Sequence, residues 1–387
     1  FISRHRDKIP KDKLQIWDNS LYSQYRVLTN RLEYHLLGNH LLEDAFSIFI
    51  ASIYFDDNGF FSLAENLLKS QLKKQVLPDG AHFEQSPMYH CILLDRLLDC
   101  YNVSISGRRG SKVHDIDFLL KEYAERMLGH LESIIYRNSE IPLLNDSANG
   151  IAPDASELFE YANRLGLKWT LIELKECGYR KFVSRVFEGI VDVGNITASY
   201  QPGHSHADTF SYELRINSSP FVVDTGISTY DKNSRRQYER STIAHNTVTI
   251  DGRDSSEVWG GFRVGKRAKV KLISESGSSV TAEHDGYGVK CKHRRCFSLK
   301  ENSFIVKDWI LGSQIAESHI HLAPGVKILS QSNNILDTDV AEIVFDGAIE
   351  VLCHDEYVSK EYNKFQQTKV LSISFKQSLS YSIKIKS

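Results

Sequence analysis

The first half of the chain has the hydrophobic periodicity of α-helices. Apolar side chains recur at helical intervals over residues 30–46, where Asn30 is available as a cap. The same pattern predicts further helices over residues 63–77, 89–101, 117–136 and 155–165. Clusters of Gly, Pro and Asn end most of these segments, so the pattern indicates helical hairpins arranged as a bundle or a toroid.

Beyond Gly189 the pattern becomes that of short β-strands. Over residues 209–216 the apolar positions alternate, which places Phe210 and Tyr212 on one face. Further β-rich segments lie at 221–224, 247–250, 270–274, 304–309, 343–345 and 370–375. This spacing is typical of an antiparallel sandwich. We therefore predict an α+β protein with a helical domain over 1–188 and an antiparallel β-sandwich over 189–387.

Composition and charge exclude several classes of protein. A chain of 387 residues is long enough for two domains. Its 47 Lys and Arg residues nearly balance 49 Asp and Glu residues, so no global field attracts nucleic acid or anionic lipid. No apolar run approaches the ~20 residues of a membrane helix, and six cysteines are too sparse for a disulfide scaffold. Because the chain begins at Phe1, we expect a processed N-terminus or a fragment.

The densest group of ionisable residues is the segment 203–208. On a strand, alternate positions share a face, so His204, His206 and Asp208 are expected to point toward the buried side with Phe210. Ionisable groups in that position need partners or a cleft. A His-x-His pair can bring two imidazoles to one metal ion, although by itself it is a weak signal.

Two later residues strengthen a metal hypothesis. Asp224 ends an apolar strand and His245 opens another. Together with His206 they form a nitrogen and oxygen ligand set suited to Zn²⁺. The alternative is that His245 is a hydrogen-bonded turn histidine and Asp224 a turn cap. His245 and Val248 are three positions apart, so on one strand their side chains would point to opposite faces. This counts against the metal unless the strand starts after His245.

The helical half has two polar groups of its own. Asn39 and His40 lie among leucines, where an amide needs partners, and the alternative is a surface Asn beside a core His. The segment 79–90 is rich in polar side chains yet runs into an apolar helix. Ser86 with Pro87 at the first helical position is a sound cap, so this segment either caps a helix or lines a cleft.

A third dense stretch lies at residues 230–241 and contains three arginines and two tyrosines. Guanidinium groups bind carboxylate or sulfate in two-point fashion, so the stretch suits an anionic, hydroxyl-rich ligand. The alternative is a solvated loop between strands.

In this order the motifs resemble the heparinase II/III-like polysaccharide lyases, whose relatives include alginate lyases. The resemblance runs from about residue 31 to about residue 264 and rests on Asn39-His40, Asp79-Gly80, Glu84 to His90, Gly203-His-Ser-His-Ala-Asp208, Val223 to Gly226 with Tyr230, and Tyr238-Glu-Arg-Ser-Thr-Ile-Ala-His245-Asn-Thr-Val. The family implies an incomplete (α/α) toroid followed by a β-sandwich, and cleavage of uronic-acid polysaccharides by β-elimination. Only 38 residues precede Asn39, so we expect a toroid truncated at its N-terminus.

The resemblance also implies roles for individual residues. Asn39, assisted by His40, matches the group that neutralises the uronate carboxylate, and Tyr89 the phenol that protonates the leaving oxygen or relays its proton. His204 matches a histidine that acts as base or neutralises the carboxylate, and Tyr238 is a candidate second phenol. The expected substrate-binding residues are Glu84, Gln85, His90, Tyr230, Arg236 and Arg240. The positions of a structural zinc ion correspond to His206, Asp224 and His245.

Two other functions are compatible with these residues. A glycoside hydrolase would use a carboxylate pair such as Glu84 with Asp146 or Asp208. A non-catalytic protein would retain the groove for glycan binding or envelope assembly. The expected partner is an acidic polysaccharide, a homodimer is left open, and the resemblance implies a bacterial periplasmic or secreted location.

Overall fold

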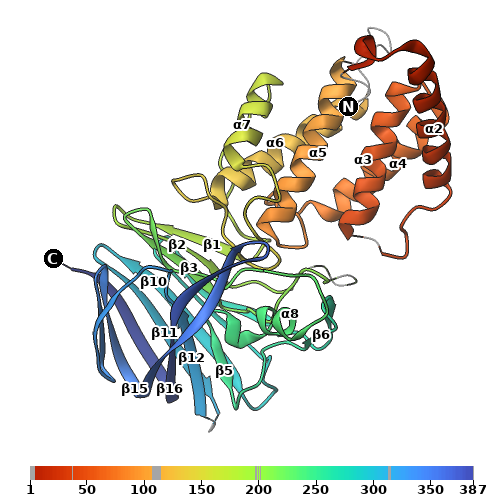
Figure 1. The fold of residues 1–387 in the computed structure, drawn as a ribbon. Coiled ribbons are helices and arrows are strands. Elements are labelled where there is room, and N and C mark those ends of the chain that lie inside the picture. The colour runs from red at the N-terminus through yellow and green to blue at the C-terminus, as the bar shows by residue number, and fades with distance from the viewer. Residues whose placement is uncertain are drawn as a thin grey trace.

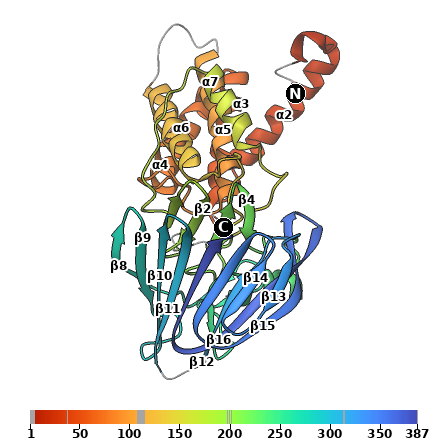
Figure 2. The ribbon, with the colours of Figure 1, turned by 90° about the vertical axis from the view of Figure 1, so that its left-hand side faces the viewer.

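The computed structural model describes residues 5–36, 38–106, 115–196, 198, 200, 202–312 and 315–386. A helical part comes first and an antiparallel β part follows, with the helices grouped at one end of the sheets (Figures 1 and 2). This arrangement confirms the predicted order of the two parts. No helix among the described residues is long and apolar enough to cross a bilayer.

The helical part is built from helical hairpins around one apolar core. Its elements are η1 (Arg6–Lys8), α2 (Lys11–Thr29), α3 (Gly38–Tyr54), α4 (Asn58–Gln75), α5 (Pro87–Ser106), α6 (Asp115–Ile134) and α7 (Ala155–Arg164). Helix α3 packs against α4 and α5, and α5 packs against α6. Side-chain oxygens cap the N-termini of α4 and α5: Phe60 N donates to Asp57 Oδ1 (2.9 Å), and Tyr89 N donates to Ser86 Oγ (3.2 Å).

Two expectations about the first helices were wrong. Asn30 follows the last residue of α2 and ends that helix, and does not cap the next one. Helix α3 begins only at Gly38, so Asn39 lies in its first turn and not in its middle. Periodicity detected the apolar face correctly, but the residues between α2 and α3 form a turn that the apolar pattern alone does not distinguish from helix.

The β part consists of two main sheets. The small sheet has the order β1 (Tyr179–Val183), β2 (Phe187–Asp192), β3 (Tyr212–Ile216) and β4 (Ser219–Val222). The large sheet has the order β13 (Ile328–Gln331), β14 (Ile335–Thr338), β15 (Ala341–Glu361), β16 (Lys364–Ile385), β11 (Ser303–Leu311), β10 (Lys292–Lys300), β9 (Ser279–His284) and β8 (Val270–Ser276), with β12 (Ile315–His321) pairing with β16 and β5 (Val248–Ile250). One apolar core joins both sheets, for example through Phe187 and Tyr212 of the small sheet and Phe304 of the large one.

The boundary expected at residue 188 falls inside β2 of the small sheet. The helical part ends with α7 at Arg164, and strand pairing starts at Tyr179. Residues 179–183 were included in the helical half because a five-residue strand is too short for its periodicity to be distinctive.

The small sheet is buried on both faces because the helical part covers it. All five residues of β3 are buried. Tyr136, just after α6, donates its hydroxyl to Glu213 Oε2 of β3 (2.7 Å), and Arg137 N donates to Glu188 of β2 (3.1 Å). Because both faces of β3 are buried, the predicted alternation of apolar and polar residues does not separate a buried face from an exposed one. It marks only the face toward the large sheet.

The expected strand through the His-x-His motif is absent from the described residues. Residues 203–211 form turns, and β3 begins only at Tyr212. Phe210 has a φ of 68°, which interrupts an extended chain, and Ser211 N donates to Asp208 O (2.7 Å). The orientation of His204 and His206 is therefore set by side-chain partners and not by strand parity.

The turn after α4 depends on a glycine. Gly80 has a φ of 79°, and a Cβ there would lie 2.3 Å from the carbonyl oxygen of Arg126 on α6. We expect Gly80→Ala to lower the free energy of unfolding by more than Gly150→Ala, measured by urea denaturation. Gly150 has a similar φ of 77° but no atom within 4 Å of its Cβ position, so its substitution should cost only the about 1–2 kcal/mol of left-handed backbone. Equal losses in the two variants would contradict the close approach of this turn to α6.

Candidate active site

A fully buried carboxylate lies at the centre of the candidate site. Asp146 lies in the connection between α6 and α7 and binds three side chains from the β part. His204 Nδ1 lies 2.9 Å from its Oδ2, His206 Nε2 lies 2.8 Å from its Oδ1, and Arg236 donates from Nη1 (2.5 Å) and Nη2 (2.7 Å). Burial alone would raise the pKa of Asp146, but the Arg236 charge and the two imidazoles hold that pKa well below its ordinary value. Asp146 is therefore an ionised anchor.

His204 connects this anchor to two phenols. Its ring centroid lies 4.0 Å from that of Tyr89, near the start of α5, at an interplanar angle of 32°. The Tyr89 hydroxyl lies 3.3 Å from the hydroxyl of Tyr230. The structure thus brings together Tyr89, His204 and Tyr230, three of the residues singled out in the sequence.

The two phenols are held in their neutral form. Burial raises the pKa of Tyr89 to about 12, and burial likewise raises the pKa of Tyr230 above its ordinary value. A neutral phenol can donate a proton, which suits Tyr89 to the acid role that the resemblance implies.

Glu84 closes the other side of His204. Its Oε2 lies 3.8 Å from His204 Nε2, and its Oε1 accepts a hydrogen bond from Asn39 N (3.2 Å) at the start of α3. Glu84 is buried, and burial raises its pKa. Its Oε2 has no hydrogen-bond partner among the described residues. Glu84 therefore lies between the N-terminus of α3 and the imidazole of His204.

His40 and Tyr238 contact residues outside the group around His204. His40 is exposed, and its Nδ1 lies 3.1 Å from Glu33 Oε2. The Tyr238 ring faces the guanidinium of Arg235 at 5.2 Å, and burial raises its pKa, with Glu356 as the next cause. Within the described part of the chain, no ring contact or hydrogen bond joins Tyr238 to Tyr89 or His204.

Three of the expected substrate-binding residues contact backbone carbonyl oxygens. Gln85 donates to the carbonyl oxygens of Cys177 (2.7 Å) and Asn195 (3.0 Å). His90 is buried with Nε2 3.0 Å from Met127 O, and burial lowers its pKa well below the ordinary value. Arg240 donates to Ser205 O (2.8 Å) and is also buried. The other three, Glu84, Tyr230 and Arg236, belong to the group around His204.

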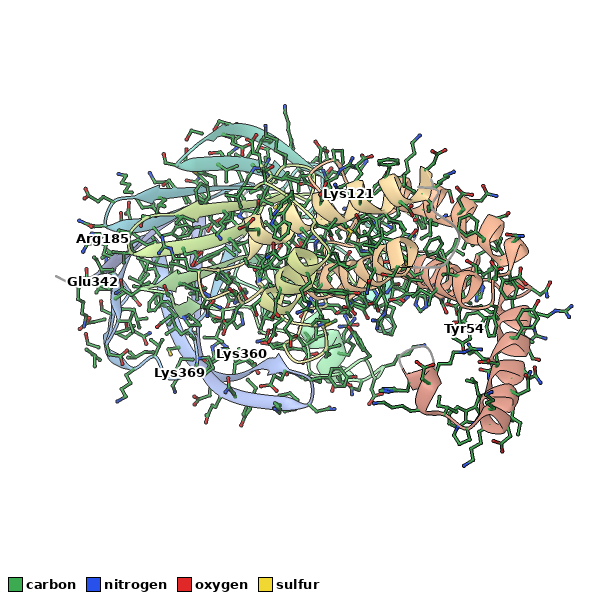
Figure 3. All side chains as sticks on the ribbon, turned by 90° about the horizontal axis from the view of Figure 1, so that it is seen from above. Tyr54, Lys121, Arg185, Glu342, Lys360 and Lys369 are labelled. Atoms are coloured by element: carbon green, nitrogen blue, oxygen red, sulfur yellow. The ribbon has the colours of Figure 1, made fainter. Side chains whose placement is uncertain are left out.

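Tyr362 is a contributor that the sequence analysis missed. Its hydroxyl accepts a hydrogen bond from Tyr230 N (2.9 Å), and the two rings lie 5.7 Å apart. It lies in the turn between β15 and β16, whose long hairpin extends to the helical part, as the position of Lys360 marks in Figure 3. Asn149 N, from the helical side, donates to Lys360 O (2.8 Å). The signal was absent because this contact joins residues far apart in the chain.

The expected zinc ligands lie directly behind this group. The rings of His206 and His245 are 5.2 Å apart, and His245 Nδ1 lies 2.7 Å from Asp224 Oδ2. His206 Nδ1 and His245 Nε2 are buried without a hydrogen-bond partner among the described residues, as is Asp208 Oδ2. Buried polar atoms of this kind are costly unless something binds them. Burial lowers the pKa of His206 to about 3, so its imidazole is neutral, the form that binds metal.

These orphaned atoms make the residues compatible with a metal ion, with one adjustment to the expected roles. Asp224 bonds Nδ1 of His245, which leaves Nε2 as the ligand atom, and a carboxylate in this position orients a metal-binding imidazole. His206, His245 and a carboxylate are a donor set that suits zinc.

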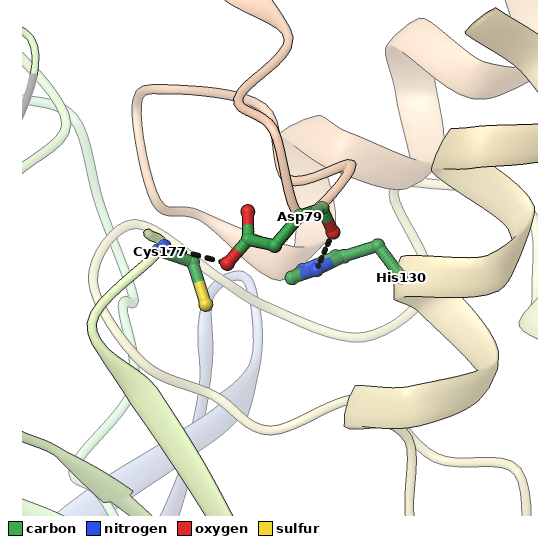
Figure 4. Close-up of side chains that lie close together, drawn as sticks. All are labelled: Asp79, His130 and Cys177. Carbon is green, nitrogen blue, oxygen red and sulfur yellow. Dashed lines mark hydrogen bonds between the residues drawn. The ribbon is translucent and has the colours of Figure 1, made fainter. Parts of the chain in front are cut away.

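The ligand atoms of His206, His245 and the carboxylates beside them do not all lie within 4.8 Å of one another. Among the described residues only Asp79, His130 and Cys177 have three potential ligand atoms that close together (Figure 4). The hydrogen bonds of this group already satisfy its carboxylate. Asp79 Oδ2 accepts from Cys177 N (2.8 Å) and Lys175 N (3.1 Å), and His130 Nδ1 lies 3.1 Å from Asp79 O. The group therefore ties the turn after α4 to the segment that enters β1.

Comparison with known proteins identifies the class. The family model for the heparinase II/III N-terminus matches residues 4–163, and the model for the heparinase II/III-like C-terminal region matches residues 167–386. The chain therefore belongs to the heparinase II/III-like family, a family of polysaccharide lyases.

Individual relatives are distant. The heparin-sulfate lyase of Bacteroides stercoris is 23% identical over 328 residues, which cover 74% of this chain and 46% of the lyase. That of Pedobacter heparinus is 26% identical over 263 residues, covering 61% and 39%. This chain thus spans less than half of either relative.

Solved structures share the fold. A mutant heparan sulfate lyase from Pedobacter heparinus aligns with a TM-score of 0.73 at 20% identity, covering 97% of this chain and 64% of that one. A chondroitin AC lyase from Streptomyces coelicolor aligns with a TM-score of 0.54 at 9% identity, covering 93% and 62%. The α-then-β architecture is common to these lyases.

The buried anchor generates a stability prediction. Asp146→Asn should lower the free energy of unfolding by about 3–5 kcal/mol, because it leaves the Arg236 charge buried without its partner. Glu160→Gln, which removes one side of the exposed ion pair with Arg164, is the control and should leave the unfolding midpoint almost unchanged. Urea denaturation of both variants tests the difference, and similar midpoints would contradict the anchor role.

Proposed function

We propose that this chain is a polysaccharide lyase that cleaves a 4-linked uronic-acid polysaccharide by β-elimination. The observation that carries the proposal is the convergence of Tyr89, His204 and Tyr230 around the Asp146 anchor. The names of the relatives, all heparin-sulfate lyases, favour a glycosaminoglycan as the uronate polymer.

In the proposed reaction a base removes the proton from C5 of the uronate. The electrons form a C4–C5 double bond, and the C4–O bond breaks as the leaving oxygen receives a proton. Donors aimed at the uronate carboxylate stabilise the charge that develops on it, and such stabilisation is usually the largest contribution to catalysis. We assign this task to the first turn of α3, at Asn39, and to His204.

Tyr89 is the proposed proton donor to the leaving oxygen. Its high pKa keeps it protonated at neutral pH, and the Tyr230 hydroxyl at 3.3 Å is positioned to pass a proton to or from it. Asp146 holds His204 by its Nδ1, so that Nε2 remains directed to the other side, toward Glu84.

Elimination is favoured over hydrolysis by the state of the carboxylates. Asp146 engages three side chains and is fully buried, and Asp208 is buried as well. A hydrolase needs a carboxyl pair that faces the glycosidic bond and its water. Neither partner proposed for Glu84 is placed for that role.

We also propose that a structural zinc ion binds His206 and His245, with Asp224 orienting His245. When bound, the ion would neutralise the buried carboxylates behind His204. Because polymers of this size are met outside the cytoplasm, we propose a periplasmic or secreted location.

Incubation with uronate polymers should generate an unsaturated product that absorbs in the near ultraviolet. Tyr89→Phe should lower kcat by about 10²–10⁴-fold, because it removes a positioned acid. Tyr101→Phe, further along the same helix α5, is the control and should retain turnover. Saturated ends, heavier by one water in mass spectrometry, would instead indicate a hydrolase, and absence of turnover on every polymer would reject both enzymes.

Metal analysis tests the zinc proposal without measuring activity. The purified chain should contain zinc, His245→Ala should lose it, and a chelator should lower the melting temperature of the parent but not of this variant. Cys177→Ser should keep its zinc, because the Asp79 group has its own hydrogen bonds. Loss of zinc in the Cys177 variant, or none in the parent, would contradict the assignment.

A further inference from the structure

A small hairpin beside the candidate site presents aromatic side chains to solvent. Strands β6 (Val258–Trp259) and β7 (Arg263–Val264) pair around a turn in which Gly260 and Gly261 both have positive φ. Trp259 is 47% exposed and Phe262 37% exposed. Large exposed aromatics that are grouped in this way mark binding surfaces.

The hairpin is held by its backbone, which leaves the rings available. Three side chains of the helix α8 region (Ser234–Glu239 and Arg240) donate to its carbonyl oxygens. Arg236 Nε donates to Gly261 O (3.0 Å), Gln237 Nε2 to Val258 O (2.8 Å) and Arg240 Nη1 to Trp259 O (3.4 Å). A surface fixed before a ligand arrives loses little entropy on binding.

The orientation of Trp259 is fixed as well. A Cβ on Gly265 would lie 2.8 Å from Cζ3 of Trp259, so the indole packs closely along the backbone of β7's continuation. Such a position presents one face of the ring and restricts its rotamers.

The hairpin adjoins the candidate catalytic group. The Phe262 ring lies 5.6 Å from Tyr230 and 6.3 Å from His204, and the Arg236 guanidinium lies 5.2 Å from it. Phe262 therefore forms part of the surroundings of His204, and Trp259 precedes it by three residues, on strand β6 of the same hairpin.

Trp259 also lines a surface hollow of about 730 Å³, together with Arg253, Lys266 and Tyr287. This hollow backs onto the same His-x-His segment, because Ser255 on its wall donates to Ala207 O (3.2 Å). The volume is in the range of small-molecule sites and accommodates sugar units.

The charged residues in and beside the hairpin indicate which kind of ligand it binds. The segment 258–269 contains four basic residues, Arg263, Lys266, Arg267 and Lys269, and no acidic residue. Of the acidic residues on the wall of the hollow, Glu257 Oε2 accepts from Lys266 N (3.0 Å) and Asp254 Oδ1 from Thr242 N (2.7 Å). A backbone hydrogen bond does not neutralise a carboxylate, so Asp254 and Glu257 balance Arg253 and Lys266 on the wall. The excess positive charge that favours an anion comes from Arg263, Arg267 and Lys269 in the adjoining segment.

We propose that the β6–β7 hairpin and its hollow form a second sugar-binding site, which holds an anionic sugar unit of the polysaccharide away from the bond that is cleaved. Trp259 stacks on the apolar face of the sugar ring, and Arg253 and Lys266 bind its carboxylate or sulfate. The ligand class rests on the proposed function, whereas the binding itself requires no cleavage.

The test measures binding by titration calorimetry in a Tyr89→Phe background, in which cleavage of the probe is slow. The probes are disaccharides and octasaccharides of heparan sulfate. Trp259→Ala should weaken octasaccharide binding roughly tenfold and disaccharide binding by clearly less, because a disaccharide cannot occupy both sites at once. Trp259→Phe should recover most of the loss, and Trp17→Ala, which removes a tryptophan 40% exposed on α2, should have no effect.

Lys266→Ser provides an independent variant that leaves the aromatic ring intact. It should weaken octasaccharide binding and reduce its dependence on salt concentration. Unchanged octasaccharide affinity in both the Trp259 and Lys266 variants, or equal losses for the two probes, would overturn the site, as would the absence of octasaccharide binding. Failure of the lyase reaction with a persistent Trp259 effect would instead reject the proposed function and retain this site.

Discussion

The structure around the candidate site depends on one buried carboxylate and the charge that compensates it. Asp146 comes from the helical side of the chain, and its partners His204, His206 and Arg236 come from the β side. An ionised group without water is costly, so it must keep all its donors. That requirement fixes the two imidazoles and the guanidinium relative to one another, and through them the two parts of the molecule.

Around this anchor the two parts are joined by further polar contacts that leave little freedom. Tyr136 binds Glu213, Gln85 binds the carbonyl oxygen of Cys177, and Asp79 binds the backbone of the same segment. The proposed chemistry depends on this rigidity, because Tyr89 comes from a helix and His204 from a loop of the β part. A small rotation between the two would separate the phenol from the imidazole.

The site can be divided into layers with different tasks. Tyr89, Tyr230 and His204 form the layer in which proton transfer is proposed. Behind it, Asp146 and Arg236 hold the imidazole, and deeper still His206, His245 and Asp224 form a polar cluster with unbound nitrogen atoms. The β6–β7 hairpin lies alongside, and Arg236 connects it to the anchor through Gly261 O. One arginine thus contacts both the proposed reaction centre and its flanking surface.

The sequence by itself determined the order of helices and strands and the residue types available for chemistry. Apolar periodicity reports burial within one element, so it identified α4 to α7 and, in the large sheet, β5, β8, β11, β15 and β16 but not β9, β10 or β12 to β14. The order of the motifs identified the family. It did not determine which polar side chains meet. The contact of Asp146 with Arg236 spans 90 positions, and that of Tyr230 with Tyr362 spans 132. Only packing of the two parts decided that Tyr89 faces His204 while its neighbour His90 turns into the helices, because adjacent residues on a helix point in different directions.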